Sequence, residues 1–464
     1  MEFKNIKAEW VYSISREYAY KNLLIPININ EEYVEIAIVS DFRENIINSL
    51  KLQFNKTIKV TIKKEEDILK ALNYFYLTKK NDDNIINNIL VNEIIKNAIK
   101  IKASDIHIEP KEKEIIIKNR VNGVLSIFKK IKKEYYDGII SKIKLLASMN
   151  ISEKRKPQDG KITYKYQDEN YDLRVSSILT ITGEKIVIRI LYKSLFNYSL
   201  EELNFNKDSL IKIKKLINKE NGIVLISGPT GSGKTTTLYS MLKAENKGNL
   251  NITTIEDPVE MNFESFNQIN VNESVGLTFS KGLKHILRQD PNVIMIGEIR
   301  DEETARIALR AAITGHKVYS TIHTNNHYEV FSRLKEMGIE KYLLLNAIKG
   351  IITQRLIGRL CDSCKIKYEC TKEERAILGN DSITYLYKQG KCEKCNFTGI
   401  ISRKLLSHIY LINRVEQNHI REYLNEEILK NQSNEFISRG KYLCIEGKIS
   451  FNQFLAIKEG MENE

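Results

Sequence analysis

Residues 228–235 constrain this chain more than any other stretch, because they have the pattern of a phosphate-binding loop. They read G-P-T-G-S-G-K-T and fit G-x-x-x-x-G-K-[ST]. The apolar run 223–226 precedes them and the helix-like run 236–242 follows, so the loop is expected to join a strand to a helix. There, glycines let backbone N–H groups surround a polyphosphate, and the helix N-terminus adds positive potential. The chain is therefore predicted to bind ATP or GTP within an α/β fold.

Each residue of this loop has an expected contact with the nucleotide. Lys234 is expected to reach the β- and γ-phosphates, and the Thr235 hydroxyl is expected to bind Mg²⁺. The remaining contacts are assigned to Gly228, Pro229, Thr230, Gly231, Ser232, Gly233 and Thr236. A phosphate loop occurs in kinases, GTPases and motors alike, so the reaction has to be inferred from other residues.

Two apolar runs end in carboxylates that suit nucleotide hydrolysis. The run 292–297 ends at Glu298, and the run 252–255 ends at Glu256 and Asp257. A carboxylate at the C-terminal end of a strand beside the phosphate loop can hold the Mg²⁺ shell or polarise the attacking water. The alternative for Glu298 is a solvated loop position. Asp257 stands before a proline, so its alternative role is to cap a helix.

Two histidines flank the apolar run 317–322, with His316 before it and His323 after it. A lone histidine is usually structural or solvated. A pair around a strand that lies next to the strand of Glu298 also fits a sensor of the γ-phosphate. The residues alone leave both interpretations open.

Four cysteines form two close pairs, Cys361 with Cys364 and Cys392 with Cys395. In a cytosolic chain this spacing predicts a closed tetrahedral zinc site with a structural role. The 27 residues between the pairs exceed the usual gap, and a helix expected at 373–378 fills part of it. The alternative is four free thiols.

Composition limits the class of protein further. The net charge of +13 is spread along the chain and is not gathered with aromatic residues, so nucleic acid is not an expected partner. The N-terminal residues have no apolar core of a signal peptide, and no run of about 18 uncharged apolar residues occurs. We therefore expect a cytosolic protein without a transmembrane helix.

Periodicity divides the chain into three expected units. A small α+β domain is expected over 1–80, followed by a linker over 81–90 and a second α+β domain over 91–200. The remainder, 201–464, alternates short apolar strands with helices, which indicates a parallel sheet covered on both faces. The cysteine-rich segment 361–395 is expected to be an insert in this last domain.

These motifs, in this order, resemble the secretion ATPase superfamily, in particular the type IV pilus assembly and type II secretion ATPases of the GspE/PilB group. Residues 228–235, 253–260, 293–301 and 314–325 correspond to that family's Walker A motif, aspartate box, Walker B motif and histidine box. Residues 103–110 match a motif of its preceding domain. The resemblance implies a RecA-like ATPase core preceded by a PAS-like domain. The cysteine insert corresponds to the zinc knuckle of the assembly members, which retraction members generally lack.

The resemblance also implies roles for particular residues. Glu298 corresponds to the catalytic base, and His323 corresponds to the histidine-box sensor. Arg174 and Arg189 correspond to arginines that reach the phosphates from the preceding domain, where guanidinium groups suit the charge on a transferring phosphoryl group. The alternative is that both arginines pair within their own sheet. The expected catalytic set is completed by Lys234, Glu256 and Asp257.

By the same resemblance, the chain is expected to be a homo-hexameric ATPase that is peripheral at the cytoplasmic face of the membrane. It would drive assembly of a type IV pilus or a type II secretion pseudopilus through an inner-membrane platform protein, using ATP, Mg²⁺ and Zn²⁺. Two alternatives remain. A nucleic-acid translocase or DNA-uptake motor would need a basic pore loop lined by aromatic residues. A nucleotide-gated adaptor would not hydrolyse ATP, and Glu298 argues against it.

The chain departs from the family's usual residues at several positions. Asn326 and His327 stand where an Asp-Ala pair is usual, His408 replaces a glutamate, and Asn122 replaces an aspartate. None of these positions lies in the phosphate loop or at Glu298. We expect them to affect contacts between domains and not the chemistry.

Overall fold

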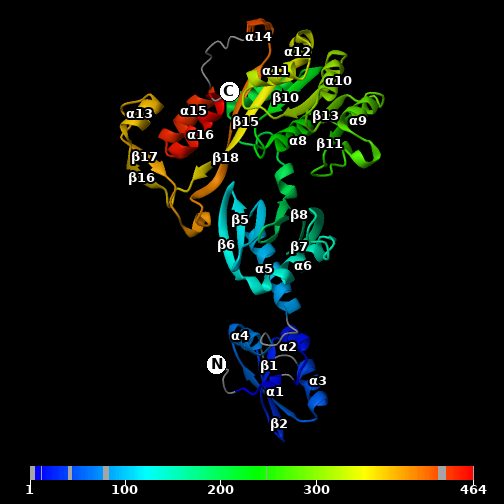
Figure 1. Cartoon of the computed structure of the whole chain (residues 1–464), viewed down its shortest axis with the longest axis vertical. Coiled ribbons are helices and arrows are strands. Elements are labelled where there is room, and N and C mark those ends of the chain that lie inside the picture. The colour runs from blue at the N-terminus through cyan, green and yellow to red at the C-terminus, as the bar shows by residue number, and fades with distance from the viewer. Residues whose placement is uncertain are drawn as a thin grey trace.

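The computed structural model describes residues 6–11, 13–39, 44–76, 83–246, 248–426 and 435–462. Within these ranges the strands form sheets of three, six, seven and two strands (Figure 1). Each of the first three sheets has its own buried apolar cluster or clusters. The structure thus confirms an α/β core preceded by α+β units.

The first unit is a small α+β fold. Strand β2 lies between β1, to which it is antiparallel, and β3, to which it is parallel. Apolar side chains of β1, β2 and α4 form most of its core. Its elements are α1 (Ala8–Val11), α2 (Arg16–Asn22), β1 (Leu24–Ile29), β2 (Tyr33–Ile38), α3 (Glu44–Phe54), β3 (Thr57–Ile62) and α4 (Glu65–Tyr76).

The second unit is an antiparallel sheet with helices on one face. Its strand order is β6-β5-β4-β9-β8-β7, and apolar residues of α5 and α6 pack against the sheet. The opposite face carries mainly charged and polar side chains. The elements are α5 (Asp83–Lys100), β4 (Asp105–Pro110), β5 (Glu114–Val121), β6 (Val124–Lys132), α6 (Tyr136–Leu146), β7 (Gln158–Tyr166), β8 (Glu169–Thr180) and β9 (Gly183–Leu191).

The segment 81–90, expected to be a linker, is helical from Asp83 onward, and this corrects the sequence-based assignment. Its first two residues lie outside the described residues. Helix α5 extends this far because apolar residues recur at helical spacing, with Leu90, Ile94 and Ala98 all packed against the core of the second unit. Asn87 is also buried, beside Gly138 of α6, so the helix packs on the second unit at least from Asn87 onward.

The third unit is built on a mostly parallel sheet of order β12-β11-β13-β14-β10-β15-β18, in which only β18 is antiparallel to its neighbour. The sheet contains the four strands expected from the sequence, β10, β11, β13 and β14, and three more, β12, β15 and β18. The central elements are α7 (Lys207–Ile217), β10 (Gly222–Ser227), α8 (Lys234–Glu245), β11 (Ile252–Glu256), β12 (Asn267–Asn270), α9 (Phe279–Ile286), β13 (Val293–Ile296), α10 (Glu302–Ile313), β14 (Lys317–Ile322), α11 (His327–Glu336), α12 (Lys341–Ala347), β15 (Ile348–Leu360) and β18 (Ile400–Leu411).

Strand β10 shows why this sheet is covered on both faces. Ile223 and Leu225 face the cluster formed with α9, α10, α11 and α12, whereas Val224 and Ile226 face the cluster formed with α7 and α8. Successive strand residues point to opposite faces, so a continuous apolar run needs a cover on each side. The predicted doubly covered parallel sheet is confirmed.

The cysteine-rich segment lies between β15 and β18 and is followed by C-terminal helices that pack on it. It contains β16 (Ile366–Glu369), α13 (Lys372–Leu378) and β17 (Tyr385–Lys388). Helices α14 (Arg414–Glu426), α15 (Glu435–Ile445) and α16 (Phe451–Glu462) follow β18, and the last two lie beside β15 and β18 (Figure 1). Apolar residues of α15 and α16 share a cluster with Leu378 and Leu386 of the insert.

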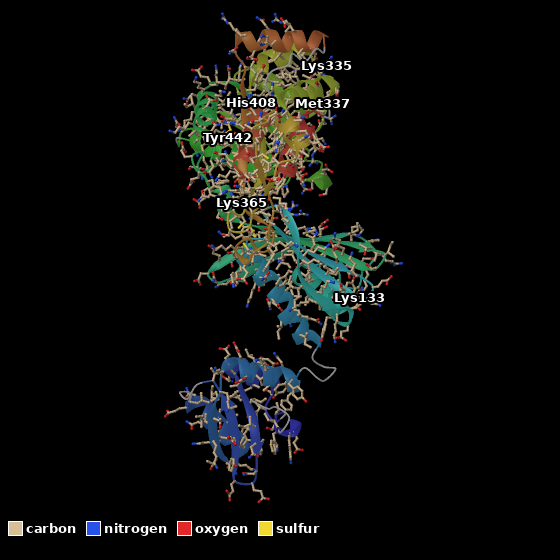
Figure 2. All side chains as sticks on the ribbon, turned by 90° about the vertical axis from the view of Figure 1, so that its left-hand side faces the viewer. Lys133, Lys335, Met337, Lys365, His408 and Tyr442 are labelled. Carbon is tan, nitrogen blue, oxygen red and sulfur yellow. The ribbon has the colours of Figure 1, made fainter. Side chains whose placement is uncertain are left out.

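The second and third units are in contact with each other. The Asn122 side chain donates to the Ile400 carbonyl oxygen over 3.5 Å, and Arg174 forms an ion pair with Glu260 at 2.9 Å. Figure 2 shows Lys365, in the cysteine-rich insert, close to this junction. Among the described residues, none of the helices has the length and apolar character needed to cross a membrane.

Candidate nucleotide-binding site

The phosphate loop joins β10 to α8, as the sequence predicts. Gly228, Gly231 and Gly233 have φ angles of 150°, 77° and 89°, a region that residues with a Cβ rarely adopt. A Cβ on Gly228 would lie 2.3 Å from the Gln354 carbonyl oxygen, so this position also needs glycine for space. The glycines therefore give the loop the curvature that exposes backbone N–H groups to an anion.

Lys234 is the first residue of α8, and its ammonium group lies inside the loop. It donates to the carbonyl oxygens of Gly228 and Pro229 over 2.7 and 3.1 Å. Burial lowers the pKa of Lys234 to about 8, and the negative charge of Glu298 opposes this shift. A buried cation held only by neutral carbonyls is suited to pair with a phosphate.

Gln354 of β15 holds the loop in place, and no sequence motif had indicated it. Its amide nitrogen donates to the Ser232 carbonyl oxygen over 2.9 Å, and its amide oxygen accepts from the Thr237 hydroxyl over 3.0 Å. The side chain is fully buried. Gln354 therefore ties the phosphate loop and the first turn of α8 to a strand more than 110 residues away in sequence.

Glu298 lies just after β13 and is the centre of a charged cluster. Its carboxylate accepts from Arg300 at 2.5 Å and lies 3.5 Å from Nε2 of His323. Burial lowers the pKa of His323, Lys234 adds to this shift, and Glu298 opposes it. Lys234, Glu298 and His323 are thus close enough to influence one another's charge. Arg300 is a further member that the sequence analysis did not identify.

The strand order corrects one expectation about this cluster. Strand β14 lies between β13 and β10, so the strand of Glu298 is not the direct neighbour of the phosphate-loop strand. All three strands are parallel, and their C-terminal ends meet at one edge of the sheet. Glu298 and Lys234 therefore still face the same edge, with His323 of the intervening strand between them.

His316 and His323 lie at opposite ends of β14 and do not act as a pair. The His316 carbonyl oxygen accepts from Gly222 N–H, and its ring nitrogen lies 3.3 Å from the Ala311 carbonyl oxygen. These contacts are at the N-terminal end of β10, away from the phosphate loop. Of the two histidines, only His323 is near Glu298.

Glu256 points into the protein interior. It accepts a short hydrogen bond from the Tyr239 hydroxyl, and its other oxygen accepts from Thr254 at 2.6 Å and Gln268 at 3.3 Å. Burial raises the pKa of Glu256, and these hydrogen bonds oppose the shift. Its recorded partners are all outside the phosphate loop, which fits a structural contact between β11, β12 and α8.

Asp257, in contrast, is exposed at the end of β11. The hydrogen bond with Glu298 raises the pKa of Arg300, and the Asp257 carboxylate adds to this shift electrostatically. Asp257 therefore lies near the cluster of Glu298. The segment that follows it is irregular, so the alternative in which Asp257 caps a helix is wrong.

The two arginines of the second unit have different partners. Arg174, on β8, forms a bidentate ion pair with Glu260. Glu260 belongs to the third unit and lies four residues after the end of β11. Arg189, directly opposite on β9, pairs with Asp105 of β4 at 3.1 Å. The alternative of pairing within the sheet thus describes Arg189 and not Arg174.

The four paired cysteines come together at the base of the insert. Their sulfur atoms lie within 4.8 Å of one another, with separations of 3.8 Å for Cys361–Cys392 and 3.7 Å for both Cys364–Cys395 and Cys392–Cys395. Four thiolates about 2.3 Å from a tetrahedral zinc ion would be about 3.8 Å apart. The cluster therefore has the ligand set and spacing of a zinc knuckle.

Comparison with known proteins assigns the family. A family model described as "Type II/IV secretion system protein" matches residues 79–456, most of the chain. The chain belongs to this family. It is a member of the secretion ATPase superfamily that its motifs resemble.

Three relatives show which members of the family this chain is similar to. Type II secretion system protein E of Dickeya dadantii is 43% identical over 324 residues, which cover 70% of this chain and 65% of that protein. Type II secretion system ATPase E of Vibrio cholerae is 40% identical over 343 residues, covering 74% and 68%. Type IV pilus assembly ATPase PilB of Myxococcus xanthus is 37% identical over 434 residues, covering 86% and 77%. The chain thus spans about two thirds to three quarters of these relatives.

Solved structures support the fold. The ATPase DotB of Legionella pneumophila superimposes with a TM-score of 0.59 at 22% identity, covering 80% of this chain and 96% of that one. The pilus retraction motor PilT with bound ADP superimposes with a TM-score of 0.52 at 24% identity, covering 79% and 96%. At this level of identity the likeness concerns the fold alone.

Two of the positions noted above as departures from the family's usual residues, 327 and 408, lie side by side. The rings of His327 and His408 have centroids 5.3 Å apart, and Tyr410 stacks on His327 at 4.3 Å. Burial lowers the pKa of His327 to about 3, and His408 adds to the shift. Asn122, a third such position, donates a hydrogen bond to the Ile400 carbonyl oxygen of the third unit. This contact between units is what we expected for Asn122.

Proposed function

We propose that this chain hydrolyses ATP and uses the energy to drive assembly of a type IV pilus or a type II secretion pseudopilus. The observation that carries the proposal is the convergence of Lys234, Glu298 and His323 at one edge of the sheet, beside a loop shaped for phosphates. The names of the relatives support the coupling of ATP hydrolysis to pilus assembly or secretion. They concern secretion and pili, so they lend no support to a nucleic-acid translocase.

The geometry suggests a role for each group. Backbone N–H groups of the loop and Lys234 would hold the β- and γ-phosphates and offset their charge. The Glu298 carboxylate would orient the attacking water and accept its proton. His323, whose pKa burial lowers, would be neutral at pH 7 and could donate a hydrogen bond to the γ-phosphate. Mg²⁺, held with the help of Thr235, would supply further neutralisation of phosphate charge.

We further propose that the chain works as a homo-hexamer against an inner-membrane platform protein at the cytoplasmic face. The arginines of the second unit support a composite site. Arg174 already contacts the core through Glu260, and Arg189 is 62% exposed although it is paired with Asp105. Either could reach a phosphate after a movement of the second unit. Zn²⁺, bound by the four cysteines, would have a structural role.

The test is steady-state ATP hydrolysis by the purified full-length chain with two variants. Lys234→Ala should lose both ATP binding and turnover. Glu298→Gln should keep ATP binding and lose turnover by about 10²-fold or more, because the amide cannot accept the proton of the attacking water. Turnover that is unchanged in Glu298→Gln would contradict the hydrolytic mechanism and would favour a nucleotide-gated adaptor.

A further inference from the structure

The loop that carries His323 begins where the sheet ends. Strand β14 pairs with β10 as far as Ile322, and residues 323–326 then lead to α11. The His323 side chain is 50% exposed, and its Nε2 lies 3.5 Å from the Glu298 carboxylate. Sheet pairing does not fix the backbone here, and packing covers only half of the side chain. The position of His323 therefore depends on the contacts that hold this short loop.

Glu329, in the first turn of α11, holds the loop from one side. Its carboxylate accepts a hydrogen bond from the backbone N–H of Asn325 over 2.6 Å and another from the Asn326 side chain. Asn326 caps α11, since its side-chain oxygen accepts from the Glu329 N–H over 2.9 Å. These reciprocal bonds resemble a capping box. They connect the loop to the helix that directly follows it, and not to the sheet.

Arg355 of β15 connects the same loop to the sheet. Its Nη2 donates to the side-chain oxygen of Asn325 over 3.1 Å. The guanidinium also donates to two carbonyl oxygens of α16, that of Gly460 over 2.8 Å and that of Ala456 over 3.4 Å. Burial lowers the pKa of Arg355, and the negative charge of Glu329 opposes this shift. Glu329 is therefore near enough to stabilise the half-buried cation beside Asn325.

Helix α16 has space for this guanidinium because of a glycine. A Cβ on Gly460 would lie 2.7 and 2.8 Å from the two terminal nitrogens of Arg355, too close for either to stay in place. A glycine inside a helix is otherwise destabilising relative to alanine. Here it lets the guanidinium lie against the backbone of α16, which runs beside β15 (Figure 1). Arg355 is thus held by α16 while it donates to Asn325.

Arg355 and its neighbour Gln354 hold two different parts of the nucleotide site. Successive residues of a strand point to opposite faces of the sheet. Gln354 reaches the phosphate loop through Ser232 and Thr237, whereas Arg355 reaches the loop of His323. Strand β15 thus contributes to the distance between the two loops. Functional groups have to be held within about 0.5 Å of their productive geometry, so this distance matters for a contact with the γ-phosphate.

We propose that Arg355 is a positioning residue for His323, acting through its hydrogen bond to Asn325. Glu329 supplies the counter-charge that keeps the guanidinium beside the loop, and α16 holds the guanidinium from the other side. This assignment rests on the role of His323 in the proposed ATPase function. It makes β15 and the last helix of the chain part of the support of the site.

The test is steady-state ATP hydrolysis by the full-length chain, with kcat and KM determined separately. Asn325→Ala removes the acceptor on the loop, and Arg355→Met removes the guanidinium and keeps the apolar stem. We expect Asn325→Ala and Arg355→Met each to lower kcat about tenfold or more, because a small displacement of a reacting group can have a large effect on rate. The KM of Asn325→Ala should change less than about twofold, since the phosphate loop is intact. With His323→Ala already present, neither substitution should lower kcat further.

Arg439→Met is the matched control. Arg439 donates to the Ser407 carbonyl oxygen over 2.7 Å, and so joins another C-terminal helix, α15, to β18 of the same sheet. Its variant should keep kcat within about twofold of the unmodified chain, although it loses a comparable contact.

Several results would overturn the positioning role and leave the proposed function intact. They are a normal kcat in Asn325→Ala, a rise in its KM in place of the loss of kcat, equal losses of kcat in Arg355→Met and Arg439→Met, and a further loss when either substitution is added to His323→Ala. A normal kcat in His323→Ala alone would instead contradict the proposed role of His323, and the positioning role with it.

Discussion

Arg174 of the second unit and Glu260 of the ATPase core form a two-pronged ion pair, with nitrogen–oxygen distances of 2.9 and 3.4 Å. Its partners are 86 residues apart, and it joins two separately packed sheets. In this arrangement the guanidinium expected to reach a phosphate is already engaged by a carboxylate. Nucleotide binding that recruits Arg174 has to release it from Glu260.

Removing this competition should strengthen nucleotide binding. Glu260→Gln frees Arg174, and we expect the apparent KM for ATP to fall by about two- to fivefold, since a half-exposed ion pair is worth roughly 0–1 kcal/mol. Arg174→Ala should raise KM, and the double variant should resemble Arg174→Ala alone. Additive effects of the two substitutions on KM would show that the residues act independently.

Gln354 should matter for both stability and nucleotide affinity. Gln354→Ala leaves the Thr237 hydroxyl and the Ser232 carbonyl oxygen buried without their partner, which costs about 1–3 kcal/mol for each group. We expect a lower free energy of unfolding in urea and weaker ATP binding. Thr237→Val is the matched control, because it removes one of the two hydrogen bonds and keeps the side-chain shape. If Thr237→Val lowers the free energy of unfolding as much as Gln354→Ala does, Gln354 contributes nothing beyond its hydrogen bond with Thr237.

ATP binding should be accompanied by proton uptake above pH 8. The free chain has a Lys234 pKa of about 8, and a bound phosphate stabilises the ammonium form and raises this pKa. At pH 8.5 about three quarters of the free chains would have neutral Lys234, and at pH 7 about one tenth. The number of protons taken up is obtained from calorimetric enthalpies in buffers of different ionisation enthalpy. Equal proton uptake at pH 7 and pH 8.5 would contradict the assignment of Lys234 as the group that pairs with the phosphate.

His327 should make the protein less stable in acid. Its pKa is about 3 in the folded state, well below the ordinary histidine value, so between these values the unfolded chain binds more protons. The contribution of His327 to the free energy of unfolding is fully present above about pH 6.5. It decreases as the pH falls below that value, by at most about 1.4 kcal/mol per pH unit. His327→Phe keeps a ring against Tyr410 and removes the titration. We expect its unfolding free energy to fall less than that of the unmodified chain between pH 7 and pH 5.

The cysteine cluster should hold one zinc ion per chain, measurable by elemental analysis after gentle purification. Cys392→Ser with Cys395→Ser should remove the zinc and lower the melting temperature, because the insert shares its apolar cluster with α15 and α16. Cys444→Ser is the matched control. This cysteine is buried in the same cluster and lies outside the group of four, so its variant should keep the metal. A protein with four free thiols at normal stability would contradict the site.

The sequence predicted those parts of the site that depend on local backbone geometry. The phosphate loop is identified by glycines at positions that need positive φ, and Lys234 follows them directly at the start of a helix. Glu298 and His323 each follow a short apolar strand, and parallel strands bring such ends to one edge. The cysteine pairs are equally local, since each pair occupies one tight turn.

Only the tertiary structure decided which distant side chains meet. Gln354 reaches the phosphate loop, and Arg174 reaches Glu260, across more than 80 residues. Glu256 and Asp257 are adjacent in sequence, yet the alternation of a strand turns the first into the core and leaves the second at the surface. Likewise, α16 lies far from β15 in sequence, yet it packs on that strand, where the Gln453 side chain donates to the Gly358 carbonyl oxygen over 2.8 Å. Local patterns set each backbone conformation, whereas the partners of its side chains depend on how the sheets and helices pack.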